Sequence, residues 1–347
     1  MKEGSLDAPV RHAIPWQGEE FYDLEKLDEE LRRVFDVCHG CRRCFNLCDS
    51  FPKLFDLIDD SKSGELDSVS SEDFKPVVNA CTLCDMCYMT KCPYVPPHEF
   101  NLDFPHLMLR YRAIQFKNGD IPFVNKELTK TDRNGKNFGK IASIVNWASN
   151  RENLISRKIL ETTCDVHRDA SLPEFQKETF VKKQKNAPPS INTQAPAYGR
   201  KAVIYATCFV NYNNPSIGFA AQGVLNLNGV TTEVVYPSCC GMPQLEQGNI
   251  QEVARSAEKV AKELRSWVND GNDIIALTPS CALMLKFEWP LILPENEDVR
   301  ALSGATFDID EYIVAIAKKE GLAGGLKSLD GGVTLHHACH SRAQNFG

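Results

Sequence analysis

Apolar residues in the first half of the chain recur mainly at helical spacing. Between residues 21 and 37 they return every three or four positions among many charged residues, which predicts an amphipathic helix. Asp103, followed by Pro105, is typical of a helix start, and the helix would stop at Asn118-Gly119. Shorter helical segments are predicted at residues 74–80, 138–149 and 151–160.

After residue 200 the pattern changes to short apolar runs that alternate with helical stretches. The predicted strands cover residues 202–207, 231–236, 273–278 and 333–337, and the predicted helices 215–227, 249–268 and 309–319. Such alternation is typical of βαβ units and a parallel sheet. Residues 182–200 are polar and rich in proline, which indicates a linker. We therefore expect a multidomain α and α/β protein with a helical domain at 1–181 and an α/β domain at 201–347.

Charge is distributed unevenly along the chain. The net charge is −7, yet residues 101–200 carry 17 bases and 10 acids, whereas both flanking segments are acidic. Two interpretations stay open: a surface that docks an acidic partner or a membrane, or ordinary solvated helix faces. No basic stripe is interleaved with aromatic residues, so we expect no nucleic-acid partner.

The N-terminus shows no signal peptide, and no apolar run reaches the length of a spanning helix. We therefore expect a cytoplasmic protein, peripheral at most to the inner face of the membrane. Fourteen cysteines in a chain of this kind favour metal binding or redox chemistry over disulfides.

Eight of these cysteines form two closely spaced runs. The first is Cys38, Cys41, Cys44 and Cys48, with the spacing C-x2-C-x2-C-x3-C. The second is Cys81, Cys84, Cys87 and Cys92, followed by Pro93. This spacing is typical of [4Fe–4S] ferredoxins, in which the last cysteine of each run ligates the other cluster. Structural zinc is the alternative, but zinc knuckles are usually separated by a dozen or more residues.

The cross-ligation rule assigns two ligand sets. The first set is Cys38, Cys41, Cys44 and Cys92, and the second set is Cys81, Cys84, Cys87 and Cys48.

The double run and the helix Phe104-Pro-His-Leu-Met-Leu-Arg110 resemble the α-helical ferredoxin module of heterodisulfide reductase-type proteins. The same module occurs in the C subunit of anaerobic glycerol-3-phosphate dehydrogenase. The chain departs from that pattern at one point, because Asp49 rather than proline follows Cys48.

The cysteines of the α/β domain resemble the CCG motif of the same family. They are Cys208, the run Cys239-Cys240-Gly241-Met242-Pro243, and Cys281. Each follows a predicted strand, so the thiols should converge beyond the carboxyl ends of the sheet. The resemblance implies a third, non-cubane iron–sulfur cluster held by Cys208, Cys239, Cys240 and Cys281. A thiol/disulfide-active vicinal pair and packed thiols without metal stay open as alternatives.

Two features depart from a complete CCG pattern. Met284 stands where the family has its last cysteine. A weak repeat aligns residues 201–208 with 332–339, so Cys339 should join the other thiols, and the second repeat is cut off at Gly347.

These features predict an electron-transfer subunit of an oxidoreductase rather than a stand-alone enzyme. The resemblance implies that electrons enter from a flavoprotein dehydrogenase, pass two [4Fe–4S] clusters and leave toward a quinone or another acceptor. The alternative is a thiol/disulfide reductase that uses a cluster at the CCG site. A cluster-based redox sensor would need an output domain, and none is visible.

Overall fold

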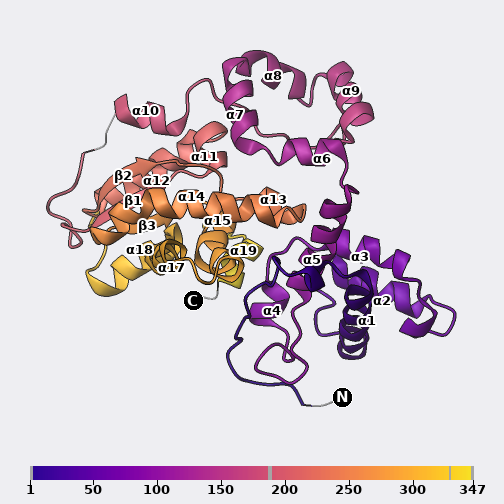
Figure 1. Cartoon of the computed structure of the whole chain (residues 1–347). Coiled ribbons are helices and arrows are strands. Elements are labelled where there is room, and N and C mark those ends of the chain that lie inside the picture. The colour runs from indigo at the N-terminus through magenta and orange to yellow at the C-terminus, as the bar shows by residue number, and fades with distance from the viewer. Residues whose placement is uncertain (1–2, 187–189, 328–329, 345–347) are drawn as a thin grey trace.

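The computed structural model describes residues 3–186, 190–327 and 330–344, and shows a helical body, an outlying helical arm and an α/β body (Figure 1). Residues 187–189, within the predicted linker, and residues 345–347, at the end of the predicted second repeat, lie outside the described residues.

The helical body is built from amphipathic helices whose apolar faces share one core. Its elements are η1 (Glu19–Tyr22), α1 (Leu24–Cys41), α2 (Ser50–Asp59), η2 (Leu66–Ser68), η3 (Ser71–Phe74), α3 (Lys75–Ala80), α4 (Met86–Thr90) and α5 (Phe104–Asn118). Phe104 of α5 packs on Phe35 and Phe51, with ring centroids 6.0 and 4.7 Å apart. Helix α5 begins where Asp103 accepts a hydrogen bond from the His106 amide and ends at Gly119, as predicted.

The arm consists of four short helices joined by tight turns. They are α6 (Phe123–Leu128), α7 (Thr131–Lys140), α8 (Ala142–Ser149) and α9 (Leu154–Cys164). The helix predicted at 138–149 is two helices, because Ile141 leaves the helical conformation at φ −119° and ψ 31°. Within the described residues, no helix is both long enough and apolar enough to span a bilayer.

The segment predicted as a linker is partly ordered against the α/β body. Its first part belongs to α10 (Phe180–Asn186), where Phe180 is fully buried and packs on Phe219. Further on, the Asn192 amide donates a hydrogen bond to the Asn226 carbonyl at 3.0 Å, and Ala197 is buried. Backbone hydrogen bonds and apolar burial thus hold part of this segment on the α/β body.

The α/β body contains a parallel sheet of four strands in the order β2-β1-β3-β4. The strands are β1 (Lys201–Tyr205), β2 (Thr231–Val235), β3 (Asp273–Ala276) and β4 (Thr306–Asp308). The helices are α11 (Cys208–Tyr212), α12 (Pro215–Leu227), α13 (Met242–Glu246), α14 (Ile250–Asn269), α15 (Pro279–Leu283), η4, a π-helix (Met284–Glu288), α16 (Trp289–Ile292), α17 (Glu297–Ala305), α18 (Ile309–Lys319) and α19 (Cys339–Ala343). The predicted combination of α and α/β domains is confirmed.

Alternate residues of β1 enter two different cores, as the period of a strand requires. Val203 and Tyr205 join the core that α14 covers, while Ala202 and Ile204 join the core under α12 and α18. The core under α14 is continuous with that of the helical body. The two bodies are therefore packed together rather than tethered.

The prediction of a strand at residues 333–337 is wrong. These residues form no strand, and Val333 and Leu335 are 73% and 71% exposed. The place beside β3 is taken by β4, whose Thr306 pairs with Ile274. The end of β4 is held by the helix that follows it, because Asp308 caps α18 through a capping box with Glu311.

Candidate functional site

Four cysteines of the helical body line one cavity. Cys38 and Cys41 lie in the last turn of α1, which ends where Arg42 adopts a left-handed conformation at φ 52°. Cys44 follows in the next turn, and Cys92 comes from the loop after α4. The four thiols, together with apolar and aromatic side chains, line a hollow of about 290 Å³, a volume that includes its opening to solvent. The structure thus brings together the residues of the first predicted set.

The electrostatics of this set favour a bound positive centre. Burial raises the pKa of Cys38, and the nearby thiols of Cys92, Cys44 and Cys41 raise it further. Burial raises the pKa of Cys44 to about 12, with further increases from Cys92 and Cys41 and an opposing effect of Lys91. Buried thiolates that repel one another need a metal centre to take up their charge, and such a centre deprotonates its ligands.

The second run curls tightly after α3. Cys81 ends that helix, Cys84 lies in the following loop, and Cys87 lies in the first turn of α4. Leu83 and Asp85 adopt left-handed conformations at φ 47° and 62°, which is uncommon for residues with side chains. These conformations belong to the tight curl of the backbone between Cys81 and Cys87.

Cys48, from the first run, lies among the thiols of the second. Burial raises the pKa of Cys81 to about 12, and the charges of Cys48 and Cys84 add to the effect, against an opposing effect of Arg112. The pKa of Cys87 is raised by burial and then by Cys81, Cys44 and Cys84. Because Cys44 belongs to the first set, the two sets are adjacent.

A single metal ion is not accommodated by either set. Across residues 3–186, 190–327 and 330–344, no group of three or more His, Cys, Asp or Glu side chains could hold one ion. A [4Fe–4S] cubane binds each of its four thiolates through a different iron atom. The four thiols of the first set line one hollow, as the binding of such a larger group requires.

The CCG cysteines converge at the carboxyl ends of three adjacent strands. Cys208 begins α11 after β1, Cys239 and Cys240 follow β2, and Cys281 lies in α15 after β3. The Cys239 thiol lies 3.7 Å from the Cys208 sulfur, and all of these cysteines except the intermediate Cys208 are buried. Cys339 does not join them. It is exposed and lies near Cys48 and Cys84, whose pKa values its charge raises.

The pKa values of the CCG thiols are shifted in different directions. Hydrogen bonds from Cys208 and Cys240 lower the pKa of Cys239 despite its burial. The same bonds, together with burial, raise the pKa of Cys208 and of Cys240. The set therefore favours one thiolate, at Cys239, held between two thiol donors.

Buried side chains fix the loop that carries the vicinal cysteines. The Tyr205 hydroxyl donates to the Ser238 carbonyl at 2.6 Å, and the Trp289 indole donates to the Cys240 carbonyl at 3.0 Å. Gly241 adopts φ +86°, a left-handed conformation that favours glycine, and begins α13. Met284, at the position of the missing cysteine, is fully buried in the core.

The sequence interpretation missed a contribution from the arm. Asp132, in the first turn of α7, accepts a hydrogen bond from the Cys239 amide at 3.0 Å and another from the Tyr236 hydroxyl. The side chain of Thr131 lies beside Cys208 and Cys239, and its hydroxyl acts to lower the pKa of both. The only signal in the sequence is the pair Thr131-Asp132 near a helix start, which is too common to indicate a site.

An open pocket gives access to Cys239. It holds about 1520 Å³, including its solvent-filled mouth, and lies between the arm and the helices α13 and α14. Five basic residues line it against three acidic ones. The basic residues are Lys126, Lys130, Arg133, Arg255 and Lys259. A small molecule that carries negative charge would be attracted to this pocket.

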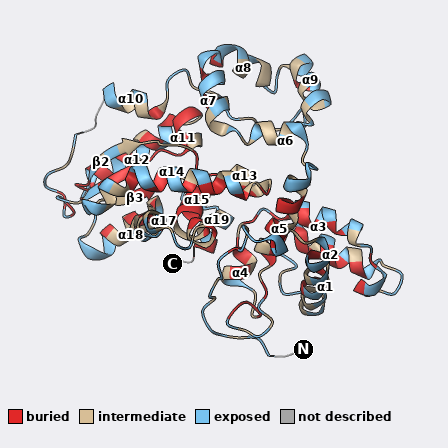
Figure 2. Cartoon of the chain, viewed as in Figure 1, coloured by how far each residue is buried: buried red, intermediate tan, exposed pale blue. Residues whose placement is uncertain are grey.

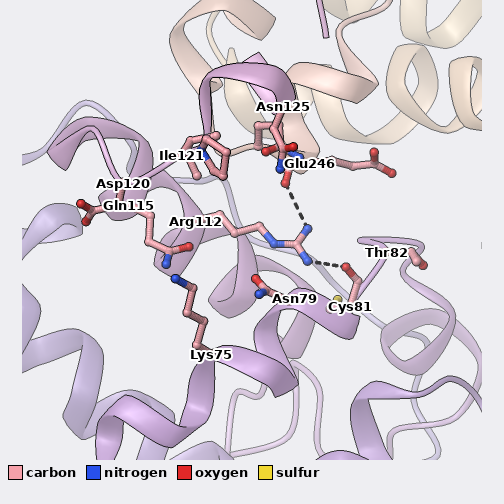
Figure 3. A pocket seen from close by; sticks show the side chains of 12 residues that line it. Lys75, Asn79, Cys81, Thr82, Arg112, Gln115, Asp120, Ile121, Asn125 and Glu246 are labelled. Atoms are coloured by element: carbon pink, nitrogen blue, oxygen red, sulfur yellow. Dashed lines mark hydrogen bonds between the residues drawn. The ribbon is translucent and has the colours of Figure 1, made fainter. Parts of the chain in front are cut away.

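Arg112 of α5 ties the second cysteine run to the α/β body (Figure 3). Its guanidinium donates to the carbonyls of Val78 at 2.6 Å and Cys81 at 2.5 Å, and to that of Glu246 of α13 at 3.2 Å. It borders a pocket of about 1050 Å³, including the solvent-filled mouth, between the two bodies. Gly248 packs so closely on Arg112 that a Cβ there would meet the Arg112 carbonyl carbon at 2.3 Å.

A buried charge network forms a second junction. Arg11 contacts Asp85 at 2.7 Å, Asp103 at 2.8 Å and Glu288 of η4 at 3.0 Å. His106 lies 3.1 Å from both Asp103 and Glu288. Burial and Arg11 would lower the pKa of His106, but the two carboxylates outweigh them and raise it to about 9. The network joins the N-terminal segment, the second run and the π-helix that follows Cys281.

The fold and the thiol arrangement define residues 202–286 as a CCG domain, and these residues match the family described as "Cysteine-rich domain". Three relatives extend this comparison. Over 218 residues, the chain is 27% identical to the C subunit of the anaerobic glycerol-3-phosphate dehydrogenase of Escherichia coli K12, a match that covers 62% of the chain and 53% of the relative. It is 29% identical to lactate utilization protein A of Bacillus pumilus over 40% of the chain and 58% of that protein.

The third relative is the D subunit of the dihydromethanophenazine:CoB–CoM heterodisulfide reductase of Methanosarcina acetivorans, 26% identical over 40% of the chain and 33% of the relative. The predicted resemblance to proteins of this kind is confirmed. The chain spans about half the length of the relative from Escherichia coli. No solved structure matches the chain.

Proposed function

We propose that the chain is an iron–sulfur electron-transfer subunit of an oxidoreductase complex. The observation that carries the proposal is the cavity lined by Cys38, Cys41, Cys44 and Cys92, with a second set of four cysteines beside it. The relatives that are named as oxidoreductase subunits support it.

Each set would hold one [4Fe–4S] cluster. Cys38, Cys41, Cys44 and Cys92 are the ligands of the first, and Cys81, Cys84, Cys87 and Cys48 those of the second. When bound, such a cluster accepts and releases one electron at a time. A further cluster at Cys208, Cys239, Cys240 and Cys281 completes the proposal.

The chain's own residues serve this function in two ways. Aromatic and apolar side chains beside the first set limit the access of water, which is one determinant of a cluster's potential. The contacts of Arg112 and Arg11 hold the second set against the α/β body, which fixes the separation between the cysteine sets.

The partners belong to the same proposal. A flavoprotein dehydrogenase would supply electrons, and the pocket at Cys239 would admit a quinone or another small acceptor. We place the protein in the cytoplasm, peripheral to the membrane. The relative that is a subunit of glycerol-3-phosphate dehydrogenase supports a redox partner of this kind.

Anaerobic purification followed by iron and sulfide analysis tests the proposal. We expect about eight iron and eight acid-labile sulfide for the two cubane sets. Iron above that amount that is lost in Cys239→Ser supports the third cluster, whereas zinc without sulfide contradicts the whole proposal.

The second candidate function is a thiol/disulfide reductase at the CCG site. It is favoured by the lowered pKa of Cys239 and its 3.7 Å approach to Cys208. Low-temperature EPR of reduced and thiol-treated protein separates the two. Two interacting cubane signals alone support electron transfer, and a thiol-dependent signal supports catalysis.

A further inference from the structure

The arm turns its large apolar side chains toward solvent. Nine of them are exposed between α6 and α9, and Ile155 is the most exposed at 79%. The nine are Phe123, Leu128, Phe138, Ile141, Ile144, Trp147, Leu154, Ile155 and Ile159. Ile144 and Trp147 are three residues apart on α8, and Ile155 and Ile159 four apart on α9, so each pair lies on one helix face.

The inside of the arm contains few buried side chains. Between residues 121 and 179, the buried residues are Gly135, Gly139, Ala142 and Arg157, and Figure 2 shows little buried surface on these helices.

Arg157 occupies the centre of the α8–α9 part and donates hydrogen bonds to the carbonyls of Ser149, His167, Arg168 and Ala170. Hydrogen bonds therefore hold these helices together, and apart from the contact of Phe138 with Phe175 their large apolar side chains form no core. Soluble monomers rarely leave such a set of side chains uncovered.

Basic residues are interspersed with the exposed apolar ones. Helices α6–α9, from residue 123 to 164, carry eight Lys and Arg against four Asp and Glu, a net charge of +4 in a chain of −7. Lys136, Lys140 and Lys158 are exposed and form no ion pair within the described part of the chain. Short helices with Trp, Phe and Ile among lysines are typical of segments that lie in a lipid interface.

We propose that helices α6–α9 dock the protein on an anionic lipid bilayer. The nine apolar side chains enter the boundary between headgroups and acyl chains, and the free lysines contact the anionic headgroups. An acidic protein could satisfy the lysines, but exposed lysines among nine dispersed apolar side chains fit a lipid interface better.

Docking would also place the pocket at Cys239 beside the bilayer. Phe123, Lys126 and Lys130 line that pocket and belong to the arm or its turns. A lipid-soluble electron acceptor could then reach Cys239 from the membrane. This last step rests on the proposed electron-transfer function, whereas the docking surface does not.

Vesicle flotation with the anaerobically purified full chain tests the surface. We expect binding to vesicles of phosphatidylcholine mixed with phosphatidylglycerol, weaker binding to phosphatidylcholine alone, and release at high salt. The triple variant Trp147→Ser, Leu154→Ser, Ile155→Ser should bind about ten-fold more weakly, since it removes three large apolar groups from the interface.

Matched variants test whether vesicle binding depends on the arm or on exposed apolar side chains anywhere on the chain. Leu154 and Leu326 are exposed to 76% and 74%, but only Leu154 lies on the arm. Leu154→Ser should weaken binding and Leu326→Ser should not. Trp147→Phe should keep the binding and abolish the blue shift of tryptophan fluorescence on vesicles.

Equal binding of Leu154→Ser and Leu326→Ser overturns the proposal. Two further results would overturn it. In the first, the chain does not bind anionic vesicles and the backbone amides of the arm exchange freely with solvent. In the second, these amides become protected from exchange only when a protein partner is added. Because none of these variants touches a cysteine, iron content should stay at the wild-type level. A failure of docking is therefore distinguishable from a failure of the cluster proposal.

Discussion

The cysteine runs of the helical body and the CCG thiols of the α/β body are built in different ways. In the runs, Cys38, Cys41 and Cys44 come from consecutive turns of backbone, and only the fourth thiol of the set comes from elsewhere. At the CCG site, the ends of three strands each contribute a cysteine from a different part of the chain. A run thus specifies most of a site locally, whereas the CCG site exists only when the sheet has formed.

The two regions also differ in what surrounds their sulfurs. The first set borders a cavity, which suits a bound group. The CCG thiols contact one another directly, with a 3.7 Å sulfur–sulfur approach and an open pocket at Cys239. Under the proposed function, the first two sets relay electrons, and the CCG site beside the open pocket exchanges them with an acceptor.

Cysteine substitutions should give the largest effects. Cys92→Ser should remove about four iron atoms per chain, those of the first cluster, because Cys92 lies with the first-run thiols although it belongs to the second run. Cys239→Ser should leave both cubane sets intact. Iron and acid-labile sulfide per chain measure the difference, with Cys164→Ser as a control outside all three sets. EPR shows which cluster each variant loses, and loss of a cubane signal in Cys239→Ser would contradict the separation of the two regions.

Gly248→Ala should weaken the junction between the regions. The residue has φ +78°, and a Cβ would meet the Arg112 backbone at 2.3 Å. We expect a destabilisation of about 3 kcal/mol from backbone strain and the clash together. Gly271→Ala is the matched control, since Gly271 has φ +76° with nothing within 4 Å. It should cost only about 1 kcal/mol. Anaerobic thermal melts compare the two, and equal shifts would show that the junction is not close-packed.

Arg112→Gln should change the second set selectively. The guanidinium lies beside Cys81, and a positive charge stabilises the more negative, reduced form of a cluster. Its removal should lower the reduction potential of the second cluster, and unpaired carbonyls should cost about 2 kcal/mol of stability. EPR-monitored redox titration measures the potential, and Arg112→Lys should restore part of it. An equal shift at both clusters would argue for a general structural effect.

His106→Gln should alter the pH dependence of stability. The ordinary pKa of 6.5 rises to about 9 in the folded protein, so folding favours the protonated ring. The stabilisation is complete below pH 6.5 and is lost as the pH rises toward 9. The wild type should therefore lose melting temperature between these values, and the variant should show a flatter profile. Parallel profiles would mean that His106 carries no proton in the folded state.

Several elements of the fold were predictable because their signals are local. Helix α5 begins at its Asp103 cap and ends at Gly119, and β1 to β3 lie within two residues of their predicted ends. The strand at 333–337 was predicted wrongly from an apolar run that resembles β1. Its place in the sheet was taken by β4, a strand of three residues that is too short to show the alternation of apolar and polar positions by which a strand is predicted.

The sequence alone determined the spacing of the cysteine runs, the helical and α/β character of the two bodies, and the thiols expected at the strand ends. These features depend on residues close together in the chain or on the two-residue and 3.6-residue periods. Only the tertiary structure decided the partners of Arg11 and Arg112, the contact of Asp132 with Cys239, the place of Cys339, and the outward-facing apolar side chains of the arm. Such contacts join residues up to 277 positions apart, and no local pattern encodes them.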